Sequence, residues 1–230
     1  MAIKHIFFDL DNTLWDFDCS SMITFRQLYN EFKLKESGIP NAEQFHHVYM
    51  GYNDDLWDLY RKGLIDKSFL KTERFRLPLA DFGINDIRLS HDMGEYYTTY
   101  APHNVALVNG AIDVLDHLKQ HYHIHLITNG FADVQKIKIH DSGIEDYIDS
   151  MTVSEEINIK KPDTRLFYHA LNKVSAKTNE SIMIGDDLEI DILPAKSIGM
   201  SQIYFNKKHL LHDEDVDYEI DDLLSINNIL

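Results

Sequence analysis

The chain has 230 residues, of which 44% are hydrophobic, and its 38 acidic against 22 basic residues give a formal net charge of −16. That charge disfavours a nucleic-acid polymer or an anionic membrane surface as the main partner, and no uninterrupted apolar segment approaches the ~20 residues that span a bilayer. Cys19 is the only cysteine, which excludes an internal disulfide and a cysteine-based zinc site, and we expect a cytoplasmic protein.

The first predicted element is a strand over residues 6–8, an apolar run typical of a strand buried on both faces. Asp9 and Asp11 follow at the end of the strand, where open α/β sheets bind ligands. A continuing strand would bring both carboxylates to one face, where only a cation or a shared proton offsets their repulsion. The pair is therefore either a divalent-metal site with one carboxylate free to act as nucleophile, or an Asp-rich turn that caps the next helix.

The next segment, residues 17–100, shows helical periodicity and no convincing strand. Apolar residues recur at three- and four-residue steps, Asp66 can cap the third run, and Pro102 stops the last one. Four successive helices after one strand indicate a helical insertion between the first and second strands of an α/β domain. The predicted helices cover about 22–32, 45–60, 66–82 and 86–100.

From residue 102 onward, strands alternate with helices, a pattern that predicts a parallel sheet with right-handed crossovers. The tail from Leu211 is expected to end in a helix packed on the body. We therefore expect an α/β fold, with a Rossmann-like catalytic core of residues 1–15 and 102–230 and a helical cap domain of residues 16–101. The later predicted strands cover 124–127, 151–153, 182–184 and 202–205.

Polar side chains follow three of these strands at the point where each strand ends. Because the carboxyl ends of parallel strands meet at one edge, these groups form one site if the second and fourth strands flank the first. Carboxylates hold a hard cation such as Mg²⁺, while a lysine and a hydroxyl neutralise and orient phosphate oxygens. The set suits phosphoryl transfer. It comprises Asp9, Asp11, Thr128, Asn129, Asp186 and Asp187, with Lys161 in a loop at the same edge.

Four motifs in this order resemble the haloacid dehalogenase superfamily. Asp-x-Asp-x-Thr falls on residues 9–13, the second-motif hydroxyl on Thr128, the lysine before proline on Lys161, and Gly-Asp-Asp-x-x-x-Asp on residues 185–191. Each motif alone is weak, but order and spacing agree from Ile3 to Phe205. The helical insertion looks like the helical cap of that family.

The resemblance implies a Mg²⁺-dependent phosphomonoester hydrolase that works through an aspartyl phosphate. Asp9 would attack the phosphorus, and Asp11 would protonate the leaving oxygen and then activate water. Asp186 would bind Mg²⁺ with the Asp9 carboxylate and the Asp11 backbone carbonyl. Asp187 is either a further metal contact or a solvated carboxylate, and Asp191 either caps its helix or braces the loop. The phosphoryl group would be held by Thr128 and Lys161, with Asn129 in support.

Substrate choice is expected in the cap, where Asn53, Trp57 and Arg61 are spaced four apart on one helix face. The surrounding stretch, residues 56–63, resembles the cap of bacterial pyrimidine 5′-nucleotidases. Trp57 could stack on a base while Arg61 or Asn53 bonds its edge or the sugar, or Trp57 could be core and Arg61 solvated. We expect a small phosphorylated metabolite, a nucleoside monophosphate, as ligand, and a monomer or homodimer.

Other activities stay open at this point. A sugar-phosphate or phosphoglycolate phosphatase and a β-phosphoglucomutase-like mutase would use the same aspartates. An acid at Asp11 argues against carbon–halogen cleavage, and the presence of Asp9 and Asp11 argues against a non-catalytic binding protein. Finally, His121, His123 and His125 alternate along one predicted strand, which fits a metal site or, more simply, solvated and structural histidines.

Overall fold

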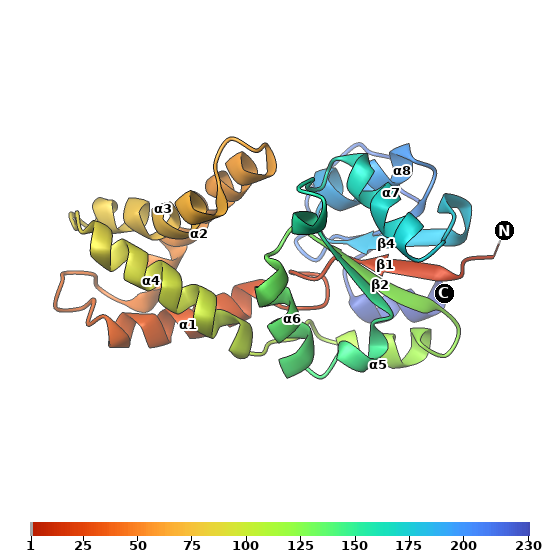
Figure 1. Cartoon of the computed structure of the whole chain (residues 1–230). Coiled ribbons are helices and arrows are strands. Elements are labelled where there is room, and N and C mark those ends of the chain that lie inside the picture. Colours follow the sequence, from red (N-terminus) through yellow and green to blue (C-terminus); the bar gives the residue numbers. More distant parts are fainter. Residues whose placement is uncertain (1) are drawn as a thin grey trace. The chain divides into compact units, whose positions relative to one another are not determined.

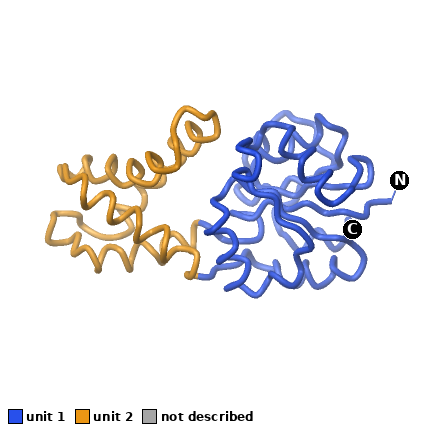
Figure 2. Tube along the Cα trace, in the orientation of Figure 1, with its two compact units in different colours: residues 1–17, 105–230 blue, residues 18–104 orange. Residues whose placement is uncertain are grey.

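The computed structural model describes residues 2–230. The chain forms two compact units: one contains the residues up to 17 together with 105–230, and the other contains residues 18–104 (Figure 2). None of the described helices combines the length and the apolar character that crossing a bilayer requires.

The first unit is built on a six-stranded sheet in the order β3-β2-β1-β4-β5-β6, in which every neighbouring pair is parallel (Figure 1). The predicted α/β fold with a parallel sheet is confirmed, and β2 and β4 flank β1 as expected. The tail differs from the prediction, because it adds a sixth strand before a short 3₁₀ segment, Leu223–Asn228. The strands are β1 (His5–Phe8), β2 (His123–Thr128), β3 (Ser150–Val153), β4 (Ser181–Gly185), β5 (Ser201–Phe205) and β6 (Tyr218–Ile220).

Both faces of this sheet are buried, which explains why β1 is an uninterrupted apolar run. Ile6 and Phe8 belong to one hydrophobic core with α5, whereas Phe7 belongs to a second core with α7. Successive side chains of a strand point to opposite faces, so each core takes alternate residues. The helices of this unit are α5 (Ala111–Leu118), α6 (Ala132–Asp141), α7 (Thr164–Lys173) and α8 (Leu193–Ser197), the last preceded by a π-helical turn, Leu188–Ile192.

The second unit consists of four helices, as the periodicity predicts, and it has an aromatic core of its own. Phe25, Tyr49 and Phe75 are fully buried there, and their ring centroids lie 4.5 to 5.8 Å apart. The Asp66 side chain accepts a hydrogen bond from the backbone N–H of Phe69 and so caps the third helix. The helices are α1 (Phe17–Glu31), α2 (Ala42–Arg61), α3 (Lys67–Asp81) and α4 (Ile87–Tyr100), followed by a short 3₁₀ turn, Ala101–His103.

Histidines gather at the amino ends of β1 and β2. His5 Nδ1 lies 3.1 Å from His125 Nε2, and the His5 ring stacks on both His123 and His125. His125 is buried, and burial together with the nearby His5 lowers its pKa to about 4. In the described part of the chain, the ligating atoms of these residues do not form a group of three close enough to share a metal ion. The geometry favours structural histidines.

Replacing His125 with glutamine should make stability less sensitive to acid. The unfolded histidine ionises near its ordinary pKa of about 6.5. The folded one stays neutral down to about pH 4. Between these values only the unfolded state takes up the proton, so the free energy of unfolding of the wild type falls by about 2–3 kcal/mol between pH 6.5 and pH 4.5 and does not change from this cause above pH 6.5. Urea unfolding at pH 7.5 and 4.5 measures the difference. The exposed His121→Gln variant is the control, and equal acid losses in wild type and His125→Gln would contradict this.

Candidate active site

The chain leaves β1 in a tight turn, so the strand does not continue to Asp11. The carbonyl of Leu10 accepts the backbone N–H groups of Leu14 and Trp15 at 3.0 and 2.8 Å, and Asn12 takes a left-handed conformation with φ 63°. Leu10, Leu14 and Trp15 are fully buried, which holds the turn against the core. As a result, the side chains of Asp9 and Asp11 reach different partners instead of sharing one strand face.

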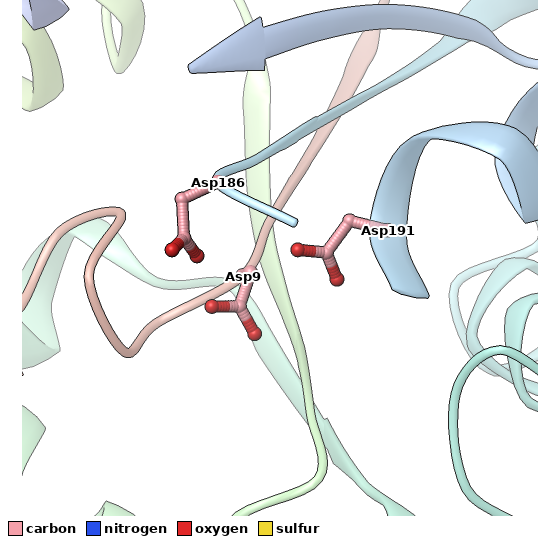
Figure 3. A group of neighbouring side chains, drawn as sticks. All are labelled: Asp9, Asp186 and Asp191. Carbon is pink, nitrogen blue, oxygen red and sulfur yellow. The ribbon is translucent and has the colours of Figure 1, made fainter. Parts of the chain in front are cut away.

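Three carboxylates meet where β1 and β4 end (Figure 3). One oxygen each from Asp9, Asp186 and Asp191 lies within 4.8 Å of the others. Asp9 follows β1 and Asp186 follows β4, whereas Asp191 comes from the π-helical turn after β4. Hard oxygen ligands at this spacing are the kind of donor set that Mg²⁺ takes in proteins.

Lys161 is the cation of this group and is almost fully buried. Its Nζ donates to Asp9 Oδ1 at 2.6 Å and to Asp191 Oδ1 at 2.5 Å. Burial, with the charges of Asp191 and Asp11, raises the pKa of Asp9 to about 7 although Lys161 opposes the shift. Burial also raises the pKa of Asp186 and of Asp191. One ammonium faces three carboxylates, so the group is short of positive charge, and these residues could hold a divalent cation that offsets the deficit.

Thr128 is the last residue of β2 and Asn129 follows it, beside this group. Thr128 Oγ1 accepts hydrogen bonds from the Gly130 N–H at 3.0 Å and from Gln135 Nε2 at 2.7 Å. The Asn129 amide binds the backbone of Lys161 twice: Oδ1 accepts its N–H at 2.8 Å, and Nδ2 donates to its carbonyl at 3.0 Å. Asn129 therefore fixes the segment that carries the lysine, and Thr13 contacts the group through Asp186 Oδ1 at 3.4 Å.

Two of the predicted metal residues direct their carboxylates elsewhere. Asp187 Oδ1 accepts the backbone N–H groups of Glu189 and Ile190, both at 3.0 Å, and so caps the helical turn that follows. The carboxylate of Asp11 is held by Gln135 and Lys138. The structure thus brings together the side chains of Asp9, Asp186 and Asp191. For Asp11 the predicted ligand is the backbone carbonyl, so the separate position of its carboxylate does not bear on that prediction.

Gln135 and Lys138 are site residues that the sequence analysis did not single out. They lie three residues apart on α6, and both are buried. Helix residues three apart share a face, so this buried face carries an amide and an amine where apolar side chains are the rule. That departure from the apolar pattern is the signal that could have identified them.

Two glycines leave space that the site side chains occupy. A Cβ atom on Gly130 would lie 2.2 Å from Gln135 Nε2, and one on Gly185 would lie 2.4 Å from Asp191 Oδ2. Both distances are far inside van der Waals contact. Any larger residue at either position would displace the side chain that fills the space.

The predicted substrate residues lie on α2, in the helical unit. Asn53 is buried, and its Oδ1 accepts a hydrogen bond from the Tyr49 hydroxyl at 3.2 Å. Trp57 is half-buried, with its ring edge-to-face to Tyr60 at a centroid distance of 5.5 Å. Arg61 pairs with Asp58 at 3.8 Å, and 23% of its side chain is exposed. Asn53 thus belongs to the interior of this unit, whereas Trp57 and Arg61 keep accessible surface.

Comparisons with known proteins agree on one family. A family model described as haloacid dehalogenase-like hydrolase matches residues 3–199. The chain is 30% identical to pyrimidine 5′-nucleotidase PynA of Streptococcus pneumoniae over 91% of its length and 86% of that protein. It is 28% identical to pyrimidine 5′-nucleotidase YjjG of Escherichia coli over 89% of its length and 86% of that protein. The magnesium-bound HAD-hydrolase YfnB of Bacillus subtilis superposes with a TM-score of 0.88 at 23% identity, covering 100% of this chain and 99% of YfnB.

Proposed function

The chain belongs to the haloacid dehalogenase-like hydrolase family, and on this premise we propose that it is a Mg²⁺-dependent phosphatase that hydrolyses nucleoside 5′-monophosphates. The observation that carries the proposal is the buried group of three carboxylates with the Lys161 ammonium at the ends of β1 and β4. Such a group combines a nucleophile, ligands for a hard cation and a fixed positive charge for a phosphoryl group.

The residues of this group fit a magnesium ion. Asp9 and Asp186 would hold it, with Asp191 beside them, because the three carboxylates are crowded and their pKa values are raised by burial and mutual repulsion. When bound, Mg²⁺ supplies positive charge to the phosphoryl oxygens. Lys161 supplies a second positive charge at this site, because its ammonium bonds both Asp9 and Asp191.

The proposed reaction runs in two displacements at phosphorus. A carboxylate oxygen of Asp9 forms a bond to phosphorus while the ester P–O bond breaks, and Asp11 as general acid gives a proton to the leaving oxygen. Asp11, now a carboxylate, takes a proton from water as that water attacks phosphorus. The bond between Asp9 and phosphorus breaks, which releases inorganic phosphate and restores both aspartates. Thr128 and Lys161 hold the phosphoryl oxygens throughout.

Two relatives and the exposed side chains of the helical unit support the proposed substrate class. Two relatives of 28–30% identity that align over about nine tenths of the chain are pyrimidine 5′-nucleotidases. We assign substrate choice to the helical unit of residues 18–104, as a cap, with Trp57 stacking on the base and Arg61 bonding its edge or the sugar. Both side chains retain exposed surface with which to contact a ligand.

Removal of the metal is the first test of this proposal. Purified protein should release p-nitrophenol from p-nitrophenyl phosphate in the presence of Mg²⁺, and excess EDTA should lower the rate at least about 100-fold, because the single Lys161 ammonium does not offset the charge of three carboxylates and a phosphate. Added Mg²⁺ should restore the rate. Hydrolysis that survives complete chelation would contradict a metal-dependent mechanism.

A substrate panel then tests the nucleotide assignment. Phosphate release from UMP, dUMP and dTMP is measured beside sugar phosphates and phosphoglycolate at equal concentrations, and the highest kcat/KM is expected with the pyrimidine nucleotides. A preference for a sugar phosphate or for phosphoglycolate would replace the nucleotidase assignment but keep the phosphatase. Isomerisation of a sugar phosphate without free phosphate would instead identify a mutase.

A further inference from the structure

The buried face of α6 carries two polar groups that contact Asp11. Gln135 is completely buried, and Lys138 is 6% exposed, whereas 31% of the Asp11 side chain is exposed. Gln135 Nε2 donates to Asp11 Oδ2 at 2.9 Å, and Lys138 Nζ donates to Asp11 Oδ1. The two residues are therefore a clamp on both oxygens of the carboxylate.

The clamp also reaches a second site residue. The same Gln135 amide nitrogen donates to Thr128 Oγ1 at 2.7 Å. Both hydrogens of the Gln135 amide group are therefore bonded to site residues, one to Asp11 and one to Thr128. The Thr128 hydroxyl accepts this bond and one from Gly130 N–H, and it still has its own hydrogen to donate to a phosphoryl oxygen. Gln135 thus fixes the distance between Asp11 and Thr128.

Lys138 also contacts two aromatic rings. Its ammonium lies 5.4 Å from the centroid of the Trp15 ring and 5.8 Å from that of Phe17, in addition to its bond to Asp11. Taking an amine out of water is costly, and a well-packed apolar pair often stabilises a fold as much or more. The attachment of α6 to the sheet therefore does not explain why this face is polar.

We propose that Gln135 and Lys138 are positioning residues that hold the Asp11 carboxylate in the orientation required for proton transfer to the leaving oxygen. The inference rests on the proposed phosphatase function. General acid–base catalysis needs the two heavy atoms within hydrogen-bond reach, about 2.6–3.2 Å, and an aspartate in a partly exposed turn is free to rotate away. A carboxylate has about four lone-pair positions, so two donors leave room for the transferred proton.

The leaving group gives the test. Lys138→Met and Gln135→Met keep the length of each side chain but remove its donor. With UMP, whose departing alkoxide needs a proton, kcat should fall about 10- to 100-fold. With p-nitrophenyl phosphate, whose phenolate is stable without one, the loss in Lys138→Met should be at least about fivefold smaller, whereas Gln135→Met also removes the bond to Thr128 and should affect both substrates. Lys136→Met, an exposed lysine on the same helix, is the matched control and should retain both rates.

A double-mutant cycle separates positioning from a general structural effect. In an Asp11→Asn background, Lys138→Met should cause no further loss of kcat with UMP, because the group that it positions is already absent. Equal losses on both substrates in Lys138→Met, or an additive loss in the Asp11→Asn background, would overturn the proposal.

Crystal structures test the clamp on Asp11 independently of the proposed function. If the wild type hydrolyses neither substrate, the phosphatase proposal fails, and the clamp is judged from crystal structures of the metal-free wild type and of Lys138→Met and Gln135→Met. Asp11 is expected in one rotamer in the wild type and in a changed or mixed rotamer in the variants. An unchanged single rotamer in both variants would overturn the clamp whatever the activity.

Discussion

Replacing Asp9 with asparagine is expected to lower kcat for phosphate release at least about 1,000-fold, because the amide cannot form the aspartyl phosphate on which the proposed reaction depends. Asparagine has the same shape and still offers an oxygen to the Lys161 ammonium, now 2.6 Å from Asp9 Oδ1. Folding should therefore be preserved. Steady-state release of phosphate from p-nitrophenyl phosphate and from UMP measures the loss.

The stability of the same variant separates a chemical from a structural effect. Burial raises the pKa of Asp9 to about 7, so above that pH the fold holds a carboxylate ion that water would solvate better. Without metal, the asparagine variant should have a Tm equal to or above that of the wild type at pH 8. Asp113→Asn, an exposed aspartate on α5, is the matched control for activity. Retention of more than about a tenth of the activity by Asp9→Asn would remove Asp9 from its assigned role.

Replacing Lys161 with methionine should damage both activity and stability. The buried ammonium is shared by Asp9 and Asp191, and its removal leaves two buried carboxylates that face each other with no counter-charge. Removing one partner of a buried ion pair typically costs about 3–5 kcal/mol. We expect a loss of that size in urea unfolding at pH 8 and a fall of at least about 100-fold in kcat.

The pH dependence of that loss has a definite sign. The pKa values of Asp9 and Asp191 are already raised by burial, and they rise further without Lys161. Groups whose pKa is raised in the folded state destabilise it as the pH increases through that pKa, because the unfolded carboxylates ionise freely. The difference between wild type and Lys161→Met should therefore be largest at pH 8 and smaller at pH 5.5. The neighbouring Lys160→Met is the control, and a small loss that is equal at both pH values would contradict this account.

Much of the sheet could be predicted because its strands are buried on both faces and therefore read as short apolar runs. The run at residues 6–8 and those ending at Ile127 and Ile184 correspond to β1, β2 and β4. The strand β6 could not be recognised in the same way, because Tyr218 and Glu219 are exposed and leave Ile220 as its single buried residue. A three-residue edge strand with one buried side chain has no apolar pattern to detect.

The site was predictable at the level of which strand ends meet, but not at the level of where each carboxylate points. Asp11 lies two residues beyond Asp9, and a continuing strand would point both side chains the same way. The family resemblance gives the two aspartates different roles, but only the hydrogen-bonded turn at Leu10 shows how their side chains are separated. Asp187 and Asp191 are four residues apart on one helical turn, and sequence spacing alone does not decide which of them caps the turn and which joins Asp9. Backbone geometry makes that choice.

The space left at Gly130 and Gly185 has a consequence for how such a site is recognised. Neither glycine has an atom that could donate a proton, bind a cation or attack phosphorus, yet a single methyl group at either position would displace Gln135 or Asp191. In a saturation mutagenesis experiment, substitutions at both glycines would therefore lower activity as much as substitutions at the residues that carry out the reaction. Intolerance to substitution at this site reports the volume that a neighbour needs as well as the chemistry of the residue that is replaced.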